Sequence, residues 1–141
     1  MVDREDDFAG VLNKFVTWLE DCKLLTCHET GGGKQQLKTF TFVTCGDWDL
    51  KYMLPDQCAT SQIKVPKYFL QWINVKQSFA MSNNGMFPRS LSQMVRDLGL
   101  TFEGRQHSGI DDVKNIVKIV KKLAEEKCCI FENTRQVQIK T

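Results

Sequence analysis

The longest run of apolar and polar positions at helical spacing begins at Val113. Its apolar members are Ile116, Val117, Val120, Leu123 and Ala124, and Lys114, Lys118, Lys121 and Lys122 fall on the opposite side. This spacing predicts a helix with one face in the core and the other in water. At about 100° per residue, Asp112 lies at the margin of the apolar face, whereas Asp111 points almost directly away from it. We therefore expect Asp111 to be an ordinary solvent or capping residue and Asp112 to be partly buried.

Shorter patterns predict three further helices. Their ranges are residues 8–21, 48–54 and 90–98. Asp6 or Asp7 can cap the first helix, Asp47 the second and Ser90 the third, because each side chain has an oxygen that can accept from a first-turn N–H. Pro55 is expected to close the second helix.

Apolar runs between the helices predict strands. Residues 39–45 (TFTFVTC) are β-branched and aromatic with few charges, which favours a central strand buried on both faces of a sheet. Residues 68–75 (YFLQWINV) are expected to form the next strand, and residues 128–131 and 137–139 a terminal hairpin around Asn133-Thr134. Because these strands interleave with helices, the pattern predicts an α/β fold.

Two carboxylates and a histidine lie where they could do chemistry. Asp112 loses hydration at the edge of its helix, so it must be hydrogen-bonded, paired with a cation or bound to a metal ion, and helix-dipole stabilisation is the structural explanation. His107 precedes it in a loop that Gly104 and Gly109 make flexible, and an imidazole can take a proton near neutral pH. Asp49 is a second carboxylate at a helix start, after a buried strand, where ligands collect in open α/β sheets.

Together these groups are suited to metal-assisted attack of water on a phosphodiester. Mg²⁺ or Mn²⁺ prefers carboxylate oxygens such as those of Asp49 and Asp112, and two such ions can hold the attacking and leaving oxygens. A neutral histidine, here His107, can take the proton of the water. Two carboxylates are few for two divalent ions, however, so the ligand set is incomplete.

Size and composition change this picture little. A chain of 141 residues with 42% apolar and 26% charged residues fits one domain, which we place at residues 1–141. No apolar run is long enough for a membrane span, and the mostly acidic residues 3–7 are unlike a signal peptide. We therefore expect an intracellular location, cytoplasmic or nuclear, and no membrane partner. A net charge of +2 is too small to indicate a nucleic-acid partner and does not exclude one.

The six cysteines favour free thiols over disulfides. None form a CxxC pair, and Cys45 and Cys128 lie in apolar, strand-like runs, so we expect buried thiols. Cys22, Cys27 and His28 could suggest zinc, but no second ligand pair has the required spacing.

Four segments, which follow one another in the expected order, resemble a known family. They are VDREDDFAGVLNKFVTWL at 2–19, GDWDL at 46–50, WINVKQSF at 72–79 and LGLTFEGRQHSGIDDVKNI at 98–116. They are similar to the enhanced-RNAi (histone-mRNA 3′ exonuclease-like) family of DEDDh 3′-to-5′ exoribonucleases, and residues 42–58 resemble its prion-protein-interacting branch. The resemblance covers nearly the whole chain, and GR-x-HSGIDD is its most specific motif.

This resemblance implies a fold, an activity and a set of site residues. The fold would be an RNase H-like mixed sheet flanked by helices, and the activity hydrolysis of RNA 3′ ends to nucleoside monophosphates with two Mg²⁺ or Mn²⁺ ions. It assigns Asp49 and Asp112 to the third and fourth acidic metal ligands and His107 to the general base. Single-stranded RNA 3′ ends are then the expected partner.

Three further residues are candidates for RNA binding. Trp48 would help wall the pocket for the terminal nucleotide, although a core aromatic is an equally good interpretation of it. Lys51 and Arg105 are candidate phosphate contacts, but a basic residue near a loop is usually only solvated.

The chain departs from the family at its start. The family's first two acidic ligands are an Asp-x-Glu pair on an opening strand, which would come before the segment matched by residues 2–19. Asp3 and Glu5 lie where the family has a turn, so we do not assign them as ligands. Absence of the opening strands would expose an edge beside residues 39–45, so either a protein partner completes the sheet or the fold is marginal. Weak metal binding and little stand-alone activity are expected for the same reason.

Two other functions are consistent with these residues. One is a catalytically incomplete relative that keeps a nucleotide pocket or a protein-binding surface. The other is a small metal-independent acid–base enzyme built on His107 and Asp112, which is disfavoured because no nucleophile or electrophile lies nearby in the sequence. Binding of Mn²⁺ together with a nucleoside monophosphate would separate the nucleotide-binding functions from a structural domain.

Overall fold

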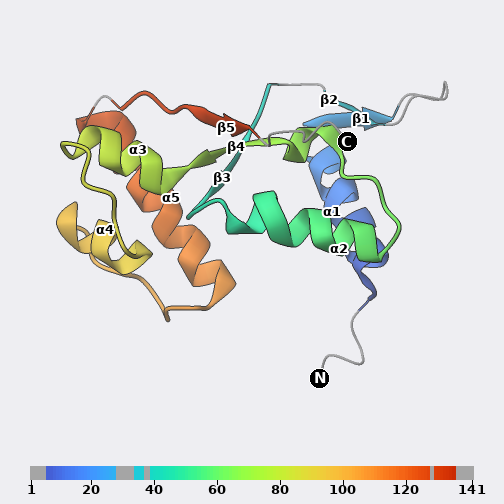
Figure 1. Cartoon of the computed structure of the whole chain (residues 1–141), viewed down its shortest axis with the longest axis horizontal. Helices are drawn as coiled ribbons and strands as arrows, with labels where there is room; N and C mark the ends of the chain where they lie inside the picture. Colours follow the sequence, from blue (N-terminus) through green and yellow to red (C-terminus); the bar gives the residue numbers. More distant parts are fainter. Residues whose placement is uncertain (1–5, 28–33, 37–38, 128, 136–141) are drawn as a thin grey trace.

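The computed structural model describes residues 6–27, 34–36, 39–127 and 129–135. These residues form a three-stranded sheet, a separate two-stranded ribbon and several helices (Figure 1). Figure 1 shows two lobes: α3, α4 and α5 lie at one end, α1, α2 and the ribbon lie at the other, and β3 and β4 run between them. The predicted α/β class is confirmed. None of the helices in this part of the chain has the length and apolar character needed to cross a membrane.

The three-stranded sheet has the order β3-β4-β5. β3 (Phe42–Thr44) pairs in parallel with β4 (Gln71–Asn74), with Phe42 beside Trp72, and β5 (Asn133–Arg135) pairs antiparallel with β4. Within the described residues β3 is therefore an edge strand with half-buried side chains, and the prediction that it is central and fully buried is wrong. An apolar run indicates that the faces of a strand are covered, but it carries no information about whether both edges are paired.

The C-terminal part of the sheet differs from the predicted hairpin. Asn133 and Thr134 lie inside β5, opposite β4, and not at a turn. Residues 137–139 lie outside the described residues. The sequence also gave no signal for the ribbon of β1 (Leu25–Cys27) and β2 (Lys34–Gln36), because three-residue strands are too short to show an apolar period.

Two helices begin at the predicted capping residues. α1 (Phe8–Asp21) follows Asp7, whose Oδ1 accepts from a first-turn N–H at 2.8 Å. α4 (Leu91–Asp97) follows Ser90, whose Oγ accepts from a first-turn N–H at 3.1 Å. Each cap satisfies a donor that the helix itself leaves unpaired.

The strand predicted at residues 68–75 divides into three elements. A 3₁₀ turn, η3 (Lys67–Phe69), precedes β4, and α3 (Val75–Ser82) begins immediately after it. Asn74 ends the strand because its Oδ1 accepts from Lys76 N–H at 3.0 Å and thereby caps α3.

The second predicted helix continues through Pro55. It consists of a π-helical segment, η2 (Asp49–Met53), followed by α2 (Leu54–Thr60), with Pro55 in the first turn of α2. The N–H of Leu54 donates to the Asp49 carbonyl, which is the wider π spacing. A proline is tolerated in the first turn of a helix because no donor is needed there, so Pro55 does not end the helix as predicted.

The main core lies between the sheet and the three helices α3, α4 and α5 (Gly109–Glu126). Its buried members are Val75, Phe79, Met94, Val95, Leu98, Ile119 and Leu123, and Val43 and Cys45 pack against them. A second, aromatic cluster joins the sheet to α1: Phe42 stacks on Phe69 with ring centroids 4.9 Å apart, and Phe15 stacks on Phe69 at 6.0 Å. Successive residues of β3 therefore contact two different clusters, as the alternation of a strand requires.

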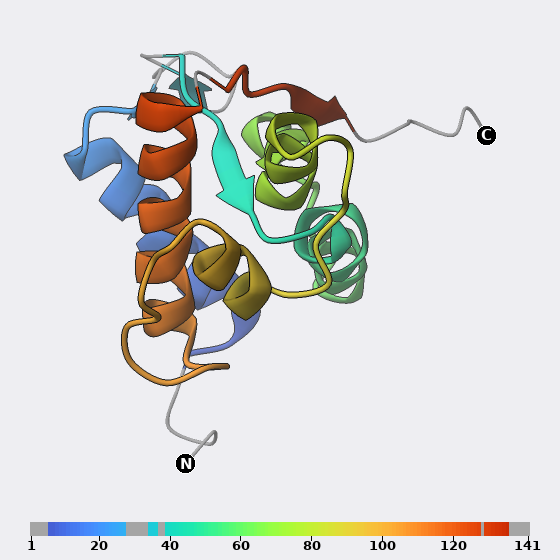
Figure 2. The same cartoon turned by 90° about the vertical axis from the view of Figure 1, so that its left-hand side faces the viewer.

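α5 carries apolar residues on two faces, and only one of them is buried. Ile119 and Leu123 are fully covered, whereas Ile110, Val113 and Val117 are 65%, 55% and 46% exposed. The three exposed residues follow one another at helical spacing and form a single stripe, so the prediction that Val117 faces the core is wrong. In Figure 2, α5 stands on one side of β3, with α3 and β5 on the other.

The cysteines only partly match the prediction of buried free thiols. Those with described surroundings are Cys22, Cys45, Cys58 and Cys129, and all four are free. Only Cys58 is buried, whereas Cys22 is exposed and Cys45 is half-buried. His28, the third residue of the zinc hypothesis, lies outside the described residues.

Truncation of two neighbouring α5 side chains should have different effects on stability. Ile119→Ala should lower the free energy of unfolding by about 2–5 kcal/mol, because it removes buried contacts and leaves a cavity. Val117→Ala, on the exposed stripe of the same helix, should change it by less than about 0.5 kcal/mol in the isolated chain. Urea unfolding followed by circular dichroism measures both values, and equal losses would contradict the assignment of the two faces.

Candidate active site

The carboxyl ends of the two parallel strands are joined by Asn74. Its Oδ1 accepts from Gly46 N–H at 3.1 Å, and its Nδ2 donates to Asp47 Oδ1, also at 3.1 Å. Asn74 is only 5% exposed, and the same Oδ1 caps α3. This one buried amide therefore fixes the loop that follows β3.

Asp47 belongs to this network and is not a helix cap. Its Oδ1 also accepts from Trp72 Nε1 at 2.9 Å, and the helix that follows has no side-chain cap. The prediction that Asp47 caps the helix is wrong because the buried indole N–H needs an acceptor and Asp47 supplies it. Asp49, two residues further on, is exposed to solvent.

Besides burial, the carboxylates of Asp112 and Asp49 both raise the pKa of the Cys45 thiol, at the carboxyl end of β3. Burial raises the pKa of the Cys45 thiol, the ammonium of Lys76 opposes the shift, and the carboxylates of Asp112 and Asp49 add to it. Two carboxylates from η2 and α5, far apart in the sequence, therefore both lie within electrostatic range of the same half-buried group. That the two carboxylates share one metal ion stays a prediction.

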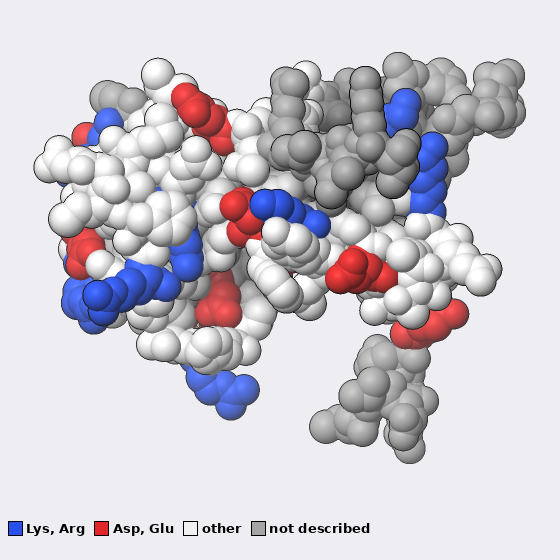
Figure 3. Space-filling model, viewed as in Figure 1, with Lys and Arg blue, Asp and Glu red and all other residues white. Residues whose placement is uncertain are grey.

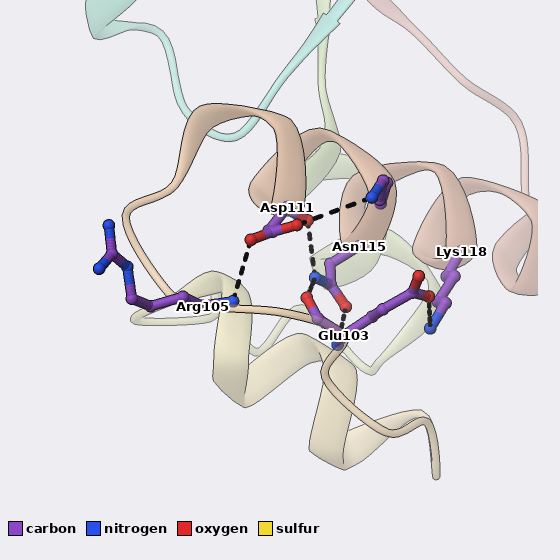
Figure 4. Close-up of polar contacts among 6 residues, drawn as sticks. Glu103, Arg105, Asp111, Asn115 and Lys118 are labelled. Atoms are coloured by element: carbon purple, nitrogen blue, oxygen red, sulfur yellow. Dashed lines mark hydrogen bonds and ion pairs between the residues drawn. The ribbon is translucent and has the colours of Figure 1, made fainter.

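The loop before α5 is anchored by Asp111. Its Oδ2 accepts from Arg105 N–H at 3.1 Å, and its Oδ1 lies 3.8 Å from Lys114 Nζ (Figure 4). The Arg105 N–H, followed by the Ser108 side chain, holds the pKa of the Asp111 carboxyl below its usual range. Gly104 has φ +77° and passes so close to Asp111 that any side chain would collide with the carboxylate. Asp111 is thus a structural anchor, where the sequence indicated an ordinary solvent or capping residue.

Asn115 extends this anchor into the core. Its Nδ2 donates to the carbonyls of Glu103, at 2.8 Å, and Asp111, at 2.7 Å, and its Oδ1 accepts from Glu103 N–H at 2.9 Å (Figure 4). Asn115 is fully buried, so these three bonds satisfy an amide that water cannot reach. Lys118 bonds to the Glu103 carboxylate at 2.7 Å and holds the pKa of Glu103 below its usual range. The loop is therefore attached to α5 at several points.

His107 and Arg105 lie on the loop that this anchor holds. His107 is exposed and has φ +64°, a left-handed conformation that is uncommon for residues other than glycine. Among the described residues it makes no hydrogen bond or ion pair with Asp49 or Asp112. The Arg105 side chain points away from Asp111 in Figure 4. The structure thus places His107 just ahead of the helix that carries Asp112, and its role as a base stays a prediction.

Trp48 and Lys51 lie on the exposed side of η2. Trp48 is 64% exposed, which contradicts the interpretation as a core aromatic, and its ring centroid lies 5.1 Å from that of Tyr52. Lys51 Nζ lies 5.3 Å from the centroid of the Tyr52 ring. A cavity of about 510 Å³ adjoins this segment, lined by Phe8, Asp49, Met53, Leu54, Asp56, Gln57 and Thr60.

The donor atoms of this region suit a hard divalent cation, but they are few. Carboxylate oxygens of Asp49 and Asp112 are the ligands that Mg²⁺ and Mn²⁺ prefer. Within the described part of the chain, however, no group of three or more histidine, cysteine, aspartate and glutamate side chains is arranged to hold a metal ion. On the face shown in Figure 3, acidic and basic side chains are interspersed and neither sign forms a continuous patch. These residues therefore fit part of a metal site.

Three further residues belong to this region and were not predicted from the sequence. Asn74 positions the loop of Asp49, the charge of Lys76 lowers the pKa of the Cys45 thiol, and Tyr52 packs on Trp48. Asn74 is the last residue of β4 and Lys76 comes two residues after it, so the strand-end argument that selected Asp49 applies to them as well. Tyr52 stands four residues after Trp48, a spacing that places two side chains on the same side of the helix predicted at residues 48–54.

The lowered pKa of Asp111 predicts how stability depends on pH. A carboxyl with a lower pKa in the folded than in the unfolded chain stabilises the fold when ionised, and this contribution is lost as the pH falls through the folded-state pKa. We expect Asp111→Asn to be less stable than the parent at about pH 7, and the difference to shrink below about pH 4. Urea unfolding at both pH values measures the difference, with Asp21→Asn at an exposed carboxylate of α1 as the control. A difference that does not change with pH would contradict a role for the charge.

Sequence comparisons relate the chain to known exonucleases. The exonuclease family model RNase_T matches residues 1–120. Human ERI1 exoribonuclease 3 is 42% identical over 125 residues, and rat 3′-5′ exoribonuclease 1 is 35% identical over 130 residues. These matches cover 88% and 90% of this chain but only 34% of each relative. The chain thus spans about a third of the length of the curated relatives it matches.

Solved structures lead to the same family. The nuclease domain of 3′hExo, a DEDDh family member, bound to rAMP, matches with a TM-score of 0.77 at 30% identity, over 96% of this chain and 63% of that chain. A structure of 3′-end-specific recognition of histone mRNA stem-loop by 3′-exonuclease matches with a TM-score of 0.76 at 27% identity, over 97% of this chain and 60% of that chain. The mixed α/β fold is that of the RNase H-like DEDDh exonucleases, and the chain belongs to the exonuclease (RNase_T) family.

Proposed function

We propose that this chain carries out metal-dependent hydrolysis of RNA 3′ ends, releasing nucleoside monophosphates from single-stranded RNA. The observation that carries the proposal is that Asp49 on η2 and Asp112 on α5 both lie within electrostatic range of Cys45, at the carboxyl end of β3. The relatives support it, because two of them bear the name 3′-5′ exoribonuclease or exoribonuclease and a structural neighbour binds rAMP.

The residues at the two loops have distinct roles in this proposal. Asp49 and Asp112 would hold Mg²⁺ or Mn²⁺, and a bound divalent ion supplies positive charge that favours attack on a phosphodiester. His107 accepts the proton of the attacking water. The hydrogen bonds of Asn74 and of Asp111 hold the two loops in place. Binding then costs less conformational entropy, because these loops are already ordered.

The RNA contacts come from the exposed side of η2 and from the anchored loop. Trp48 offers an exposed ring on which a base can stack. Lys51 and Arg105 provide positive charge for phosphates, and both side chains are exposed.

We further propose that a strand-bearing protein segment completes the sheet and supplies the remaining acidic ligands. Among the described residues β3 has no neighbour on its outer edge, and the stripe of Ile110, Val113 and Val117 is uncovered. The matched nuclease domain has a longer chain, of which this chain covers 63%. Amide hydrogen exchange that is as slow in β3 as in β4 of the isolated chain would contradict an open edge.

A binding module without hydrolytic activity is the second candidate function. It is favoured by the lack of a three-ligand group among the described residues. In that case the same residues hold a nucleotide or a protein without cleaving a phosphodiester.

For either function we propose an intracellular location without a membrane partner. We also propose that the chain belongs to the prion-protein-interacting branch, because residues 42–58 resemble it.

Calorimetry with Mn²⁺ and AMP tests the site directly. We expect weak binding by the parent chain and at least a tenfold loss, about 1.4 kcal/mol, in Asp49→Asn and Asp112→Asn, because each variant removes a charged oxygen ligand. Asp56→Asn is the matched control, since Asp56 is an exposed carboxylate that lines the same cavity as Asp49. If both site variants bind like the parent, the assignment of the site is wrong.

The same variants separate the two functions when RNA is the substrate. The chain alone should release nucleoside monophosphates from single-stranded RNA only slowly with Mg²⁺, and Asp49→Asn should abolish the release. Binding without any release, even at high protein concentration, would favour the binding module. Rapid release by the isolated chain would contradict the proposal that essential ligands are missing.

A further inference from the structure

Two exposed aromatic rings and a lysine form a small unit on the outer side of η2. Trp48 is 64% exposed and Tyr52 is 45% exposed, yet their ring centroids are only 5.1 Å apart, with the ring planes inclined by 44°. Lys51 Nζ lies 5.3 Å from the centroid of the Tyr52 ring. Tyr52 is thus in contact with both other members of the unit, which we call the Trp48–Tyr52–Lys51 platform.

The helical geometry of this segment places the two rings side by side. In η2 the N–H of Leu54 donates to the Asp49 carbonyl, so each turn contains more residues than an α-helical turn. Trp48 is the residue just before η2, and because residues four apart are neighbours on a helix surface, Trp48 and Tyr52 project from nearly the same side. Asp49 lies between them in the sequence and lines the neighbouring cavity. The platform consequently stands beside the carboxylate that we assign to the metal site.

The chemistry of the platform fits single-stranded RNA. Bases stack on aromatic side chains regardless of sequence, and a lysine beside the rings can pair with the phosphate that joins two nucleotides. An ammonium held over an aromatic face is attracted by the ring, so Tyr52 limits where the flexible Lys51 side chain can lie. Exposed rings of this size lose contact with water when a base covers them, which favours binding.

We propose that Tyr52 is a positioning residue for RNA binding. It supports the Trp48 ring for a base and holds the Lys51 ammonium where the adjacent phosphate lies. The inference rests on the proposed function and names how the RNA end is held next to Asp49. Neither the family match nor the names of the relatives assign any role to Tyr52.

The salt dependence of RNA binding tests this role. The probe is a fluorescein-labelled oligo(U) of about ten nucleotides, used with EDTA so that it is not cleaved. Each phosphate contact to a single strand contributes about 0.7 to the slope of log K against log salt concentration. Tyr52→Ala should weaken binding about three- to tenfold and lower the slope by about 0.7, because the Lys51 contact is lost with the ring.

Companion variants separate positioning from direct contact. Lys51→Gln should lower the slope by the same amount, whereas Trp48→Ala should weaken binding about tenfold without changing the slope. Tyr52→Phe keeps the ring and should behave like the parent. Phe87→Ala, at a 61% exposed aromatic outside the platform, is the matched control and should have no effect. Unfolding midpoints equal to that of the parent establish that the variants are folded.

The binding results distinguish failure of the proposed function from failure of the role of Tyr52. If the parent chain does not bind oligo(U), the proposed function fails and this inference fails with it. If the parent binds and Tyr52→Ala has the same affinity and slope, only the role of Tyr52 is wrong. A weaker Tyr52→Ala with an unchanged slope would show that Tyr52 stacks on RNA but does not position Lys51, which also overturns the proposal.

Discussion

The hydrogen bonds of Asn74 are the interaction on which the site depends most. One buried amide accepts from the loop after β3, donates to Asp47 and caps α3, so it joins the ends of two parallel strands and the start of a helix. Asp49 follows this loop directly. Since a buried amide without partners is costly, the three bonds favour one arrangement of the loop over its alternatives. The placement of Asp49 is therefore a consequence of β4 as much as of its own segment.

A second buried amide, that of Asn115, holds the loop before α5, which carries His107. Asn115 and Asp111 fasten the loop of His107 to α5, and Asp112 is the next residue along the helix. Both halves of the site lie within electrostatic range of Cys45, where burial first, and then the carboxylates of Asp112 and Asp49, raise the pKa of the thiol. Loops that hydrogen bonds hold in place, as here, can present ligands to an ion without large rearrangement, and a shared ion at Asp49 and Asp112 is the proposal. Among the described residues, β3 has a free edge, and α5, the helix of Asp112, has an exposed apolar stripe. The proposed partner segment would cover the edge of β3 and supply the remaining ligands together.

The sequence predicted the elements whose ends carry a local signal. Asp7 and Ser90 mark the starts of α1 and α4, and the apolar period identified α5. It did not reveal that β3 is an edge strand, because strand order depends on pairing between distant residues. The prediction that Pro55 ends its helix is wrong, because Pro55 lies in the first turn of α2, where a proline is tolerated.

The sequence indicated the candidate site residues that carry a local signal, but not those whose role depends on distant partners. Asp49 and Asp112 were selected because each stands at the start of a helix, which sequence shows. The supporting amides of Asn74 and Asn115 were missed, because a polar residue in an apolar pattern indicates burial only when its partners are known. Helical angles place Asp111 away from the apolar face and therefore predict a solvent or capping residue, whereas its side chain accepts from the N–H of Arg105 in the preceding loop.

The most direct test of the account is whether one ion senses both carboxylates. In a titration of the ¹⁵N-labelled chain with Mn²⁺, amide signals of residues 48–50 and 111–113 should broaden together at the same metal concentration, because paramagnetic relaxation falls steeply with distance from the ion. Signals of α1 near Asp21 should stay sharp over the same range. Broadening at only one of the two segments, or at neither before non-specific broadening of the whole chain, would contradict a shared metal ion at Asp49 and Asp112.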